Sequence, residues 1–237
     1  SGIMDQFISA GAVEGHASLM DCRALTLTPT RIPDDVVVAV MDTKTRRVLA
    51  EAAYDDRRRA CERAAAAMGV AALRDATLDG LERVTDETDR RRAHHIITDN
   101  ARVVAVMEHL RDGDVTAVGA RMNESHVSLR DDFEVSGPGL DAIVEVARSA
   151  PGCLGARMTG GGFAGCAGAR GSAELVTGEP EDDRVPGERR EVGLVVGVVG
   201  IPEVVVDAHL VEHGDVGSLH VRAVVIVVDE QQRGHIA

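Results

Sequence analysis

The chain has 237 residues, of which 44% are hydrophobic and only 2% aromatic, with one tyrosine and no tryptophan. This composition predicts a globular protein whose core is filled by aliphatic side chains and methionine. The net charge of −13 argues against a nucleic-acid partner and a polybasic membrane surface. No apolar run reaches the roughly 18–20 residues of a membrane span, so we expect a cytoplasmic protein. The cysteines, Cys22, Cys61, Cys153 and Cys166, show no zinc-binding spacing and are expected to be separate structural thiols.

The first fifty residues predict one short helix followed by three strands. Residues 1–15 can enter a helix, and the alternation of apolar side chains over 16–22 and 24–30 predicts a half-buried hairpin. Residues 36–41 form a continuous apolar run rich in valine, which is typical of a buried strand.

Between residues 50 and 150 the apolar side chains follow a helical period. Thr77 and Asp114 are expected N-caps, and Gly69 and Gly113 are expected to end helices. The predicted helices cover 55–68, 77–84, 89–111, a segment that begins after Asp114, and 139–149 with Pro138 in its first turn. The longest one is expected to bury a face made of Ala93, Ile96, Ile97, Val103, Val104, Met107 and Leu110.

Residues 154–167 predict a strand that ends in a glycine-rich turn. The order of strands, a helical layer and a further strand favours the α+β class over a doubly wound sheet. After residue 168 the composition changes: residues 170–191 are charged, and residues 192–228 are rich in valine and could form three strands.

Two motifs could have either a structural or a chemical role. Asp5 lies in an apolar string, and burying a carboxylate is costly unless it is hydrogen-bonded or paired with a cation. It is therefore either a structural cap or a functional group. The string TGGGFAG at 159–165 could bring backbone N–H groups close to phosphate oxygens, because glycine has no Cβ. Its spacing is not that of a P-loop, so a tight β-turn remains the alternative.

Several polar clusters are predicted to be structural. The Ser-His pair at 125–126 is not expected to be catalytic, because adjacent side chains on a helix diverge. The two histidines at 94–95 lack the spacing of helical metal ligands, so no metal site is predicted. The arginine runs at 57–59 and 90–92 predict solvated helix faces or ion-pair donors.

Taken together and in order, four segments resemble galactokinases, which are sugar kinases of the GHMP family. GIMDQFIS resembles the family segment with the catalytic aspartate, and AYDDRRRACE resembles its tyrosine-bearing helix start. ESHVSLRDDFEVS resembles a segment particular to galactokinases, and ARMTGGGFAGC resembles the third GHMP motif. These segments begin at residues 2, 53, 124 and 156.

The resemblance implies a GHMP-kinase-like α+β fold in three parts. These are a remainder of the N-terminal lobe with its strands at 1–50, a C-terminal helical, ferredoxin-like kinase domain at 51–167, and an atypical valine-rich tail at 168–237. The expected reaction is transfer of the γ-phosphoryl group of ATP to α-D-galactose, with Mg²⁺, giving galactose 1-phosphate. Asp5 falls at the catalytic base or sugar-orienting anion, Gly2 at a backbone contact to galactose, and Tyr54 at a side-chain contact. The phosphate region would be supported by Gly160, Gly161 and Gly162.

The sequence departs from the family in several places. Ser1 replaces a common cysteine and Ala164 replaces a usual glycine. The family's N-terminal segment, with an active-site arginine and a serine-rich ATP loop, is not found, which suggests a C-terminal fragment that is inactive alone. The tail does not resemble the family, and we expect that the reading frame is lost near residue 168; a genuine appendage is the alternative.

Two other functions remain open: another GHMP hexose kinase, and a non-catalytic galactokinase-like sugar sensor. The expected partners are galactose and ATP, with no nucleic acid and no membrane, and the protein is expected to be a monomer.

Overall fold

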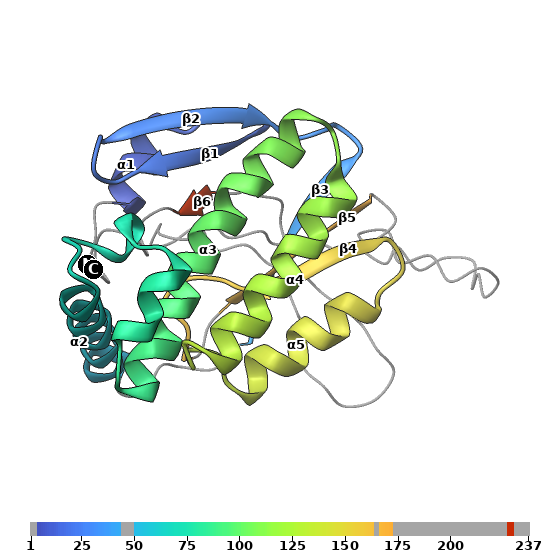
Figure 1. Cartoon of the computed structure of the whole chain (residues 1–237). Coiled ribbons are helices and arrows are strands. Elements are labelled where there is room, and N and C mark those ends of the chain that lie inside the picture. The colour runs from blue at the N-terminus through green and yellow to red at the C-terminus, as the bar shows by residue number, and fades with distance from the viewer. Residues whose placement is uncertain (1–3, 44–49, 164–165, 173–226, 230–237) are drawn as a thin grey trace, which may run out of the picture.

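The structure, a computed structural model, describes residues 4–43, 50–163, 166–172 and 227–229. Within these residues, helices cover two three-stranded sheets (Figure 1). This is the mixture of helices and strands that the sequence predicts. The first helix, α1 (Met4–Gly11), corresponds to the short helix expected near the start of the chain.

The first sheet contains the predicted hairpin. Strands β1 (His16–Asp21) and β2 (Thr26–Arg31) pair antiparallel, and β6 (Val227–Asp229) pairs parallel with β1. The hairpin loop is tied to the helical layer by two ion pairs. These are Asp21 with Arg74 at 2.9 Å and Arg23 with Asp75 at 2.7 Å.

The second sheet has the order β3-β5-β4, so the last of its three strands along the chain lies in the middle. Both neighbours, β3 (Val36–Asp42) and β4 (Cys153–Met158), are antiparallel to β5 (Cys166–Ser172). Strand β3 is buried as expected from its run of apolar residues. It belongs to the expected first domain yet pairs with a strand beyond residue 165, so the division of the chain at residue 50 stays a prediction.

Four long helices pack beside and over the sheets (Figure 1), and the predicted capping residues act at three of their ends. Gly69 and Gly113 have left-handed φ values of 75° and 73°, which suit a residue without Cβ. The Asp114 side chain accepts a hydrogen bond from Ala117 N–H at 2.9 Å. The helices are α2 (Ala50–Met68), α3 (Glu87–Arg111), α4 (Val115–Asp131) and α5 (Pro138–Ser149).

Two details of the helical prediction were wrong. The expected helix over 77–84 is a 3-10 helix, η2 (Leu78–Arg83), preceded by a second one, η1 (Leu73–Asp75), and the Thr77 side chain forms no capping hydrogen bond. On α3, Val104 is 40% exposed, whereas Val106 is 8% exposed and joins the core. Val103 faces the core. Measured around the helix axis at 3.6 residues per turn, Val106 lies about 60° from Val103, whereas Val104 lies about 100° from it in the opposite direction and so leaves the buried face.

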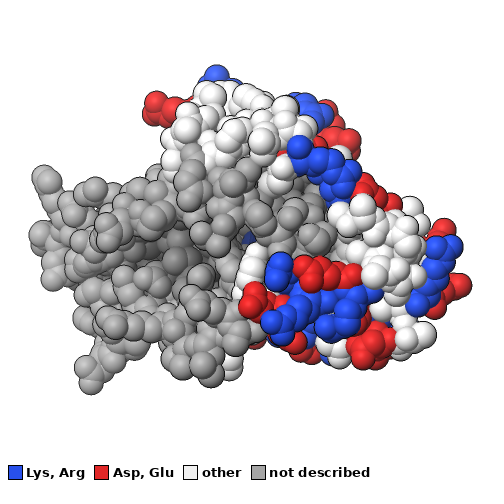
Figure 2. Space-filling view, turned by 90° about the vertical axis from the view of Figure 1, so that its left-hand side faces the viewer, with Lys and Arg blue, Asp and Glu red and all other residues white. Residues whose placement is uncertain are grey.

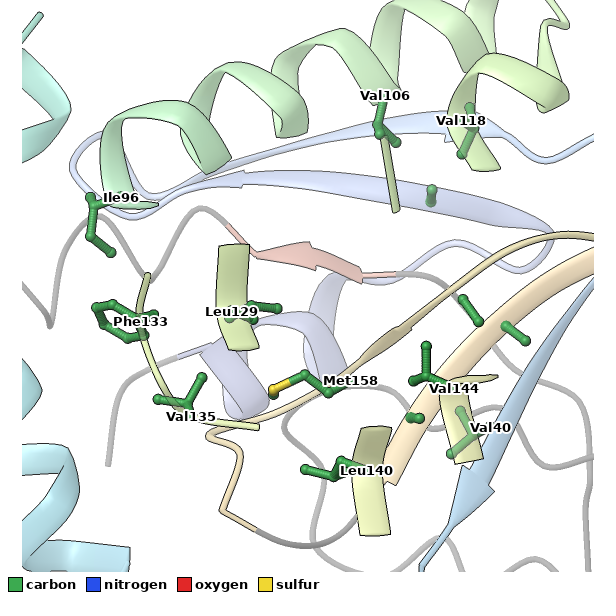
Figure 3. Close-up of a cluster of buried hydrophobic side chains, with 14 of the residues drawn as sticks. Val40, Ile96, Val106, Val118, Leu129, Phe133, Val135, Leu140, Val144 and Met158 are labelled. Atoms are coloured by element: carbon green, nitrogen blue, oxygen red, sulfur yellow. The ribbon is translucent and has the colours of Figure 1, made fainter. Parts of the chain in front are cut away.

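The hydrophobic core lies between the helices and the second sheet (Figure 3). Each fully buried aliphatic or aromatic side chain contributes roughly 1.5–3 kcal/mol to stability. One part of this core, formed by Leu129, Phe133, Val135 and Met158, lies where α4 ends and β4 meets the glycine-rich turn. The core therefore supports the segment that the sequence singles out for chemistry.

Candidate functional site

The glycine turn (residues 159–163) joins β4 to β5 and has an unusual backbone. Gly160 and Gly162 both have a φ of 75°, and Phe163 has a φ of 63°. A Cβ atom at Gly162 would overlap the carbonyl oxygen of Val135. Glycine is therefore required at this position both by its backbone conformation and by the space available.

The glycine turn rests on the segment that follows α4. Phe163 N–H donates a hydrogen bond to Val135 O at 2.7 Å. Val135 is buried in the core, and its neighbour Glu134 also has a left-handed φ, of 51°. The turn is thus positioned by residues more than twenty places earlier in the chain, within the predicted galactokinase-like segment.

Arg57 of α2 connects this segment to the helix that carries Tyr54. Its Nε donates to Phe133 O and its guanidinium also donates to Glu134 O, each at 2.8 Å. The guanidinium carbon lies 5.5 Å from the centre of the Phe163 ring, which is a cation–π distance. Burial, with Arg92 nearby, lowers the pKa of Arg57, but an arginine stays charged at neutral pH.

Two arginines of α3 hold the same segment from the other side. Arg92 is 2% exposed and donates to the Asp132 carbonyl and, at 2.6 Å, to the Glu134 carboxylate. Arg91 donates to Asp131 O and to the other Glu134 oxygen, at 3.0 and 2.9 Å. Hydrogen bonds from Arg92 and then Arg91 lower the pKa of Glu134. We call Arg57, Arg91, Arg92 and residues 131–135 the arginine junction.

The arginine runs therefore divide between two environments. Arg57 and Arg92 are ion-pair donors, as one of the two predictions had it, and they also donate to backbone carbonyls, which was not predicted. Their neighbours do pair on the surface: Arg58 with Asp55 and Glu62. Figure 2 shows basic and acidic side chains side by side over the described surface of this face. One residue of each run instead turns inward, because the helical period places it there.

The sequence contains a signal for these inward-facing arginines that was not used in the prediction. Arg57 precedes Ala60, Cys61 and Ala64 by three, four and seven positions, and all three are buried. The same spacing relates Arg92 to its own buried neighbours three, four and seven residues on. An arginine at such a spacing lies on the buried face of its helix. Burial also raises the pKa of the Cys61 thiol, which suits a structural role.

The predicted site residues are placed as follows. Tyr54 lies one helical turn before Arg57 and is 39% exposed. Gly160, Gly161 and Gly162 lie in the glycine turn, so Arg57 brings the Tyr54 helix and this turn together. Asp5 lies in the first turn of α1. Gly2, Ser1, Ala164 and the side chain of Asp5 lie outside the described residues.

A second contact joins β4 to α4, and we call it the α4–β4 seam (Gly119, His126, Leu154, Gly155 and Met158). A Cβ at Gly119 would overlap Leu154 O, and one at Gly155 would overlap Gly119 O, so helix and strand touch through their backbones. His126 Nδ1 accepts a hydrogen bond from Met158 N–H at 3.2 Å. Burial first, then the nearby Arg148, lowers the pKa of His126 to about 4. The prediction that 125–126 is structural agrees with their burial.

In the parts of the chain that the structure describes, no three His, Cys, Asp or Glu side chains gather as they would around a metal ion. Nor is any helix there both apolar enough and long enough to cross a membrane.

Comparisons with known proteins point to one family. Residues 106–176 match the family model described as GHMP kinases C terminal. A galactokinase of Actinobacillus succinogenes is 42% identical over 172 residues, which cover 70% of this chain and 45% of that protein. The crystal structure of Lactococcus lactis galactokinase complexed with galactose matches with a TM-score of 0.71 at 33% identity, covering 75% of this chain and 48% of that one.

The chain is thus similar to galactokinases of the GHMP kinase family over 70–75% of its length. The resemblance to galactokinases predicted from its motifs is confirmed, and so is the α+β fold class. The chain spans about half the length of the galactokinases it matches. The family match extends to residue 176 and β5 to Ser172, so both pass the point near residue 168 where the tail was expected to diverge.

Proposed function

We propose that the protein is a galactokinase, which transfers the γ-phosphoryl group of ATP to the anomeric hydroxyl of α-D-galactose. The observation that carries this proposal is the 42% identity to a galactokinase over 172 residues. The structural similarity to a galactokinase complexed with galactose supports the same sugar. The chain contributes the helix with Tyr54, α1 with Asp5, and the glycine turn.

The proposed roles follow the residues predicted from the resemblance. Asp5 accepts the proton of the sugar hydroxyl or holds that hydroxyl in line, Gly2 and Tyr54 contact galactose, and the glycine turn supports the phosphate region at Gly160, Gly161 and Gly162. Phosphoryl transfer depends mainly on positioning and charge stabilisation. The contacts of Arg57 support this assignment, because they fix the Tyr54 helix relative to the glycine turn.

Other parts of the proposal concern the whole protein. Kinases of this family use ATP, and we expect Mg²⁺ to accompany it. The described residues include no carboxylate cluster that suits this ion, so we assign none of them to Mg²⁺ and derive no step through it. We further propose a cytoplasmic, monomeric enzyme. The division into a lobe remainder at 1–50 and a kinase domain at 51–167 is also part of the proposal.

The proposal is tested on the protein expressed from its complete open reading frame. We expect ATP-dependent formation of galactose 1-phosphate, and a fall in kcat of about 10²–10⁴-fold for Asp5→Asn. Asp34→Asn is a matched control, because its carboxylate is exposed at the surface and pairs only with Arg31 among the described residues. Turnover of a different hexose would replace galactokinase by another GHMP sugar kinase. Binding of sugar and nucleotide without turnover would favour the sensor.

Sugar binding can be followed separately from turnover. For this measurement the 237-residue chain itself is used, because it has one tyrosine and no tryptophan and its intrinsic fluorescence therefore reports Tyr54 alone. Because Tyr54 is only partly exposed, a sugar that contacts it changes the polarity around the ring. We expect a saturable fluorescence change with galactose and a much smaller one with glucose. An unchanged signal at saturating galactose contradicts the proposed contact.

A further inference from the structure

Two residues of the site have a strained backbone, and they lie beside each other. Glu134 and Phe163 have φ values of 51° and 63°, in the left-handed region that side chains disfavour. Such a conformation is disfavoured for a residue with a Cβ and persists only where its surroundings hold it. They are connected through Val135, whose carbonyl oxygen accepts the Phe163 N–H. The strain is thus concentrated where the glycine turn meets the segment after α4.

Arg57 is the side chain that contacts both strained residues. Its guanidinium donates to the carbonyl of Glu134 and lies over the Phe163 ring. A second hydrogen bond, from Nε to Phe133 O, fixes the plane of the guanidinium. Its remaining nitrogen pairs with Asp56, the preceding residue of the same helix, at 2.8 Å. Such planar donor geometry is available to arginine and not to lysine.

These contacts begin on the helix of the proposed sugar site. Arg57 follows Tyr54 by three positions, so the two side chains lie on neighbouring parts of one helical face. Tyr54 is therefore connected to the glycine turn through one turn of α2, the Arg57 guanidinium and the Phe163 ring. A shift of α2 would move the guanidinium away from Glu134 O and Phe163 together.

We propose that Arg57 is a positioning residue, which holds the glycine turn in its strained conformation and sets its place relative to the helix that carries Tyr54. This inference rests on the proposed function, since it treats the glycine turn as the support of the phosphate region. Arg57 itself contacts neither sugar nor nucleotide in this proposal. It acts through Phe163 and the 133–135 backbone.

The first test measures how firmly Arg57 holds the glycine turn, and it requires no enzymatic activity. In Arg57→Met the amide of Phe163 is expected to exchange its hydrogen about tenfold faster or more, because the Val135 hydrogen bond opens locally. The amide of Met107, a fully buried residue of α3, reports global unfolding and should be unaffected. Arg58→Met is the matched control: Arg58 is the next residue on α2, and its side chain is 46% exposed.

The second test separates positioning from sugar binding. Because misplacement of a phosphate-supporting loop affects the chemical step, Arg57→Met should lower kcat by about ten- to a hundredfold. The KM for galactose should change less than about threefold, since Tyr54 stays on its helix. Arg57→Lys, which retains the charge and can reach one carbonyl, should recover part of kcat. Should Arg57→Met fail to fold, Arg57→Lys against Arg58→Lys makes the same comparison.

The outcomes distinguish this inference from the proposed function. If the protein phosphorylates no sugar, the proposed function fails, and Phe163 exchange still decides whether Arg57 holds the turn. Unchanged Phe163 exchange in Arg57→Met, or an equal change in Arg58→Met, overturns the inference. It is also overturned if galactokinase activity is present and kcat is the same in Arg57→Met as in the parent.

Discussion

The α4–β4 seam fixes strand β4 and the arginine junction fixes the glycine turn that follows it, by different physical means. At the seam, helix and strand are in backbone contact at Gly119 and Gly155, and no side chain fits between them. At the junction, arginine side chains from two helices reach across a wider space to backbone carbonyls and one carboxylate. The first contact depends on volume, and the second depends on charge.

This difference teaches where each region tolerates change. A close-packed contact loses stability with any added atom, because packed interiors have few voids. A charge-assisted junction accepts changes of volume more easily, but it loses stability when a buried donor or acceptor is left without its partner. The proposed phosphate-supporting turn is attached to the second kind of region, and β4 itself to the first.

The largest effect is expected at the seam. Gly119→Ala places a methyl group against Leu154 O, where both sides are backbone, so we expect a loss of about 3 kcal/mol in the free energy of unfolding. Urea denaturation measures it. Gly168→Ala in β5 is the control, since its Cβ would meet Ala39 O at an ordinary 3.8 Å. Equal stability of the two variants would mean that the seam is not close-packed.

The next effect is expected at the junction. Arg92→Met leaves Asp132 O and the Glu134 carboxylate without their buried donor, at a cost of about 2 kcal/mol. Glu134 is partly exposed and can turn to water, which limits the loss. Arg90→Met, at an exposed position of the same helix, should change the free energy of unfolding by less than about 0.5 kcal/mol. A loss at Arg92 no larger than at Arg90 would contradict the role of the junction.

The seam should also respond to pH, through His126. Its pKa in the folded protein is about 4, below the ordinary 6.5, mainly because the ring is buried. The unfolded chain therefore binds the proton more readily, so this contribution is complete above pH 6.5 and is lost as the pH falls from 6.5 towards 4. The contribution of His126 to the free energy of unfolding amounts to about 3 kcal/mol.

The pH measurement needs a variant that keeps the hydrogen bond. His126→Asn retains an acceptor for Met158 N–H and cannot titrate. The free energy of unfolding of the parent should fall more steeply than that of His126→Asn between pH 6.5 and 4. Parallel curves would remove His126 as the titrating group and leave the carboxylates as the cause of acid unfolding.

The smallest effect is expected at the exposed edge of the junction. Arg91 pairs with Glu134 where both side chains are partly solvated, so Arg91→Met should cost less than about 1 kcal/mol. Raising the salt concentration to about 1 M shortens the Debye length to about 3 Å and should remove most of this difference. The loss in Gly119→Ala should stay the same in high salt. A salt-independent loss at Arg91 would indicate packing rather than charge.

Local signals explain which parts of the fold could be predicted from the sequence. The hairpin, the strand at 36–41, α3, and the capping residues Gly69, Gly113 and Asp114 all depend on neighbours within a few positions, and each is found in the structure. The glycine turn was also located correctly. The end of α3 is marked by Gly113 and was predicted correctly. Its buried face was harder to predict, because Val104 and Val106 are the same residue type and differ only in their angle around the helix.

The junction could not be predicted in the same way. Arg57 and Glu134, whose carbonyl accepts its hydrogen bond, are 77 positions apart. Every residue has a backbone carbonyl, so the sequence does not indicate which one accepts the bond. The periodicity of α2 did indicate that Arg57 faces inward, but it did not indicate the partner. The exact packing at Gly119 was hidden for the same reason, because Leu154 and Gly155 belong to a distant strand.

The strand order β3-β5-β4 also affects how the chain reaches this structure. As the chain is synthesised from its N-terminus, β3 and β4 are completed before β5, the strand that pairs with both of them. Until β5 arrives, the apolar β3 has an unpaired edge, and such edges promote aggregation. Pairing between strands so far apart in sequence is also slow. The yield of folded protein should therefore depend on how long β3 remains unpaired while the chain up to β5 is translated.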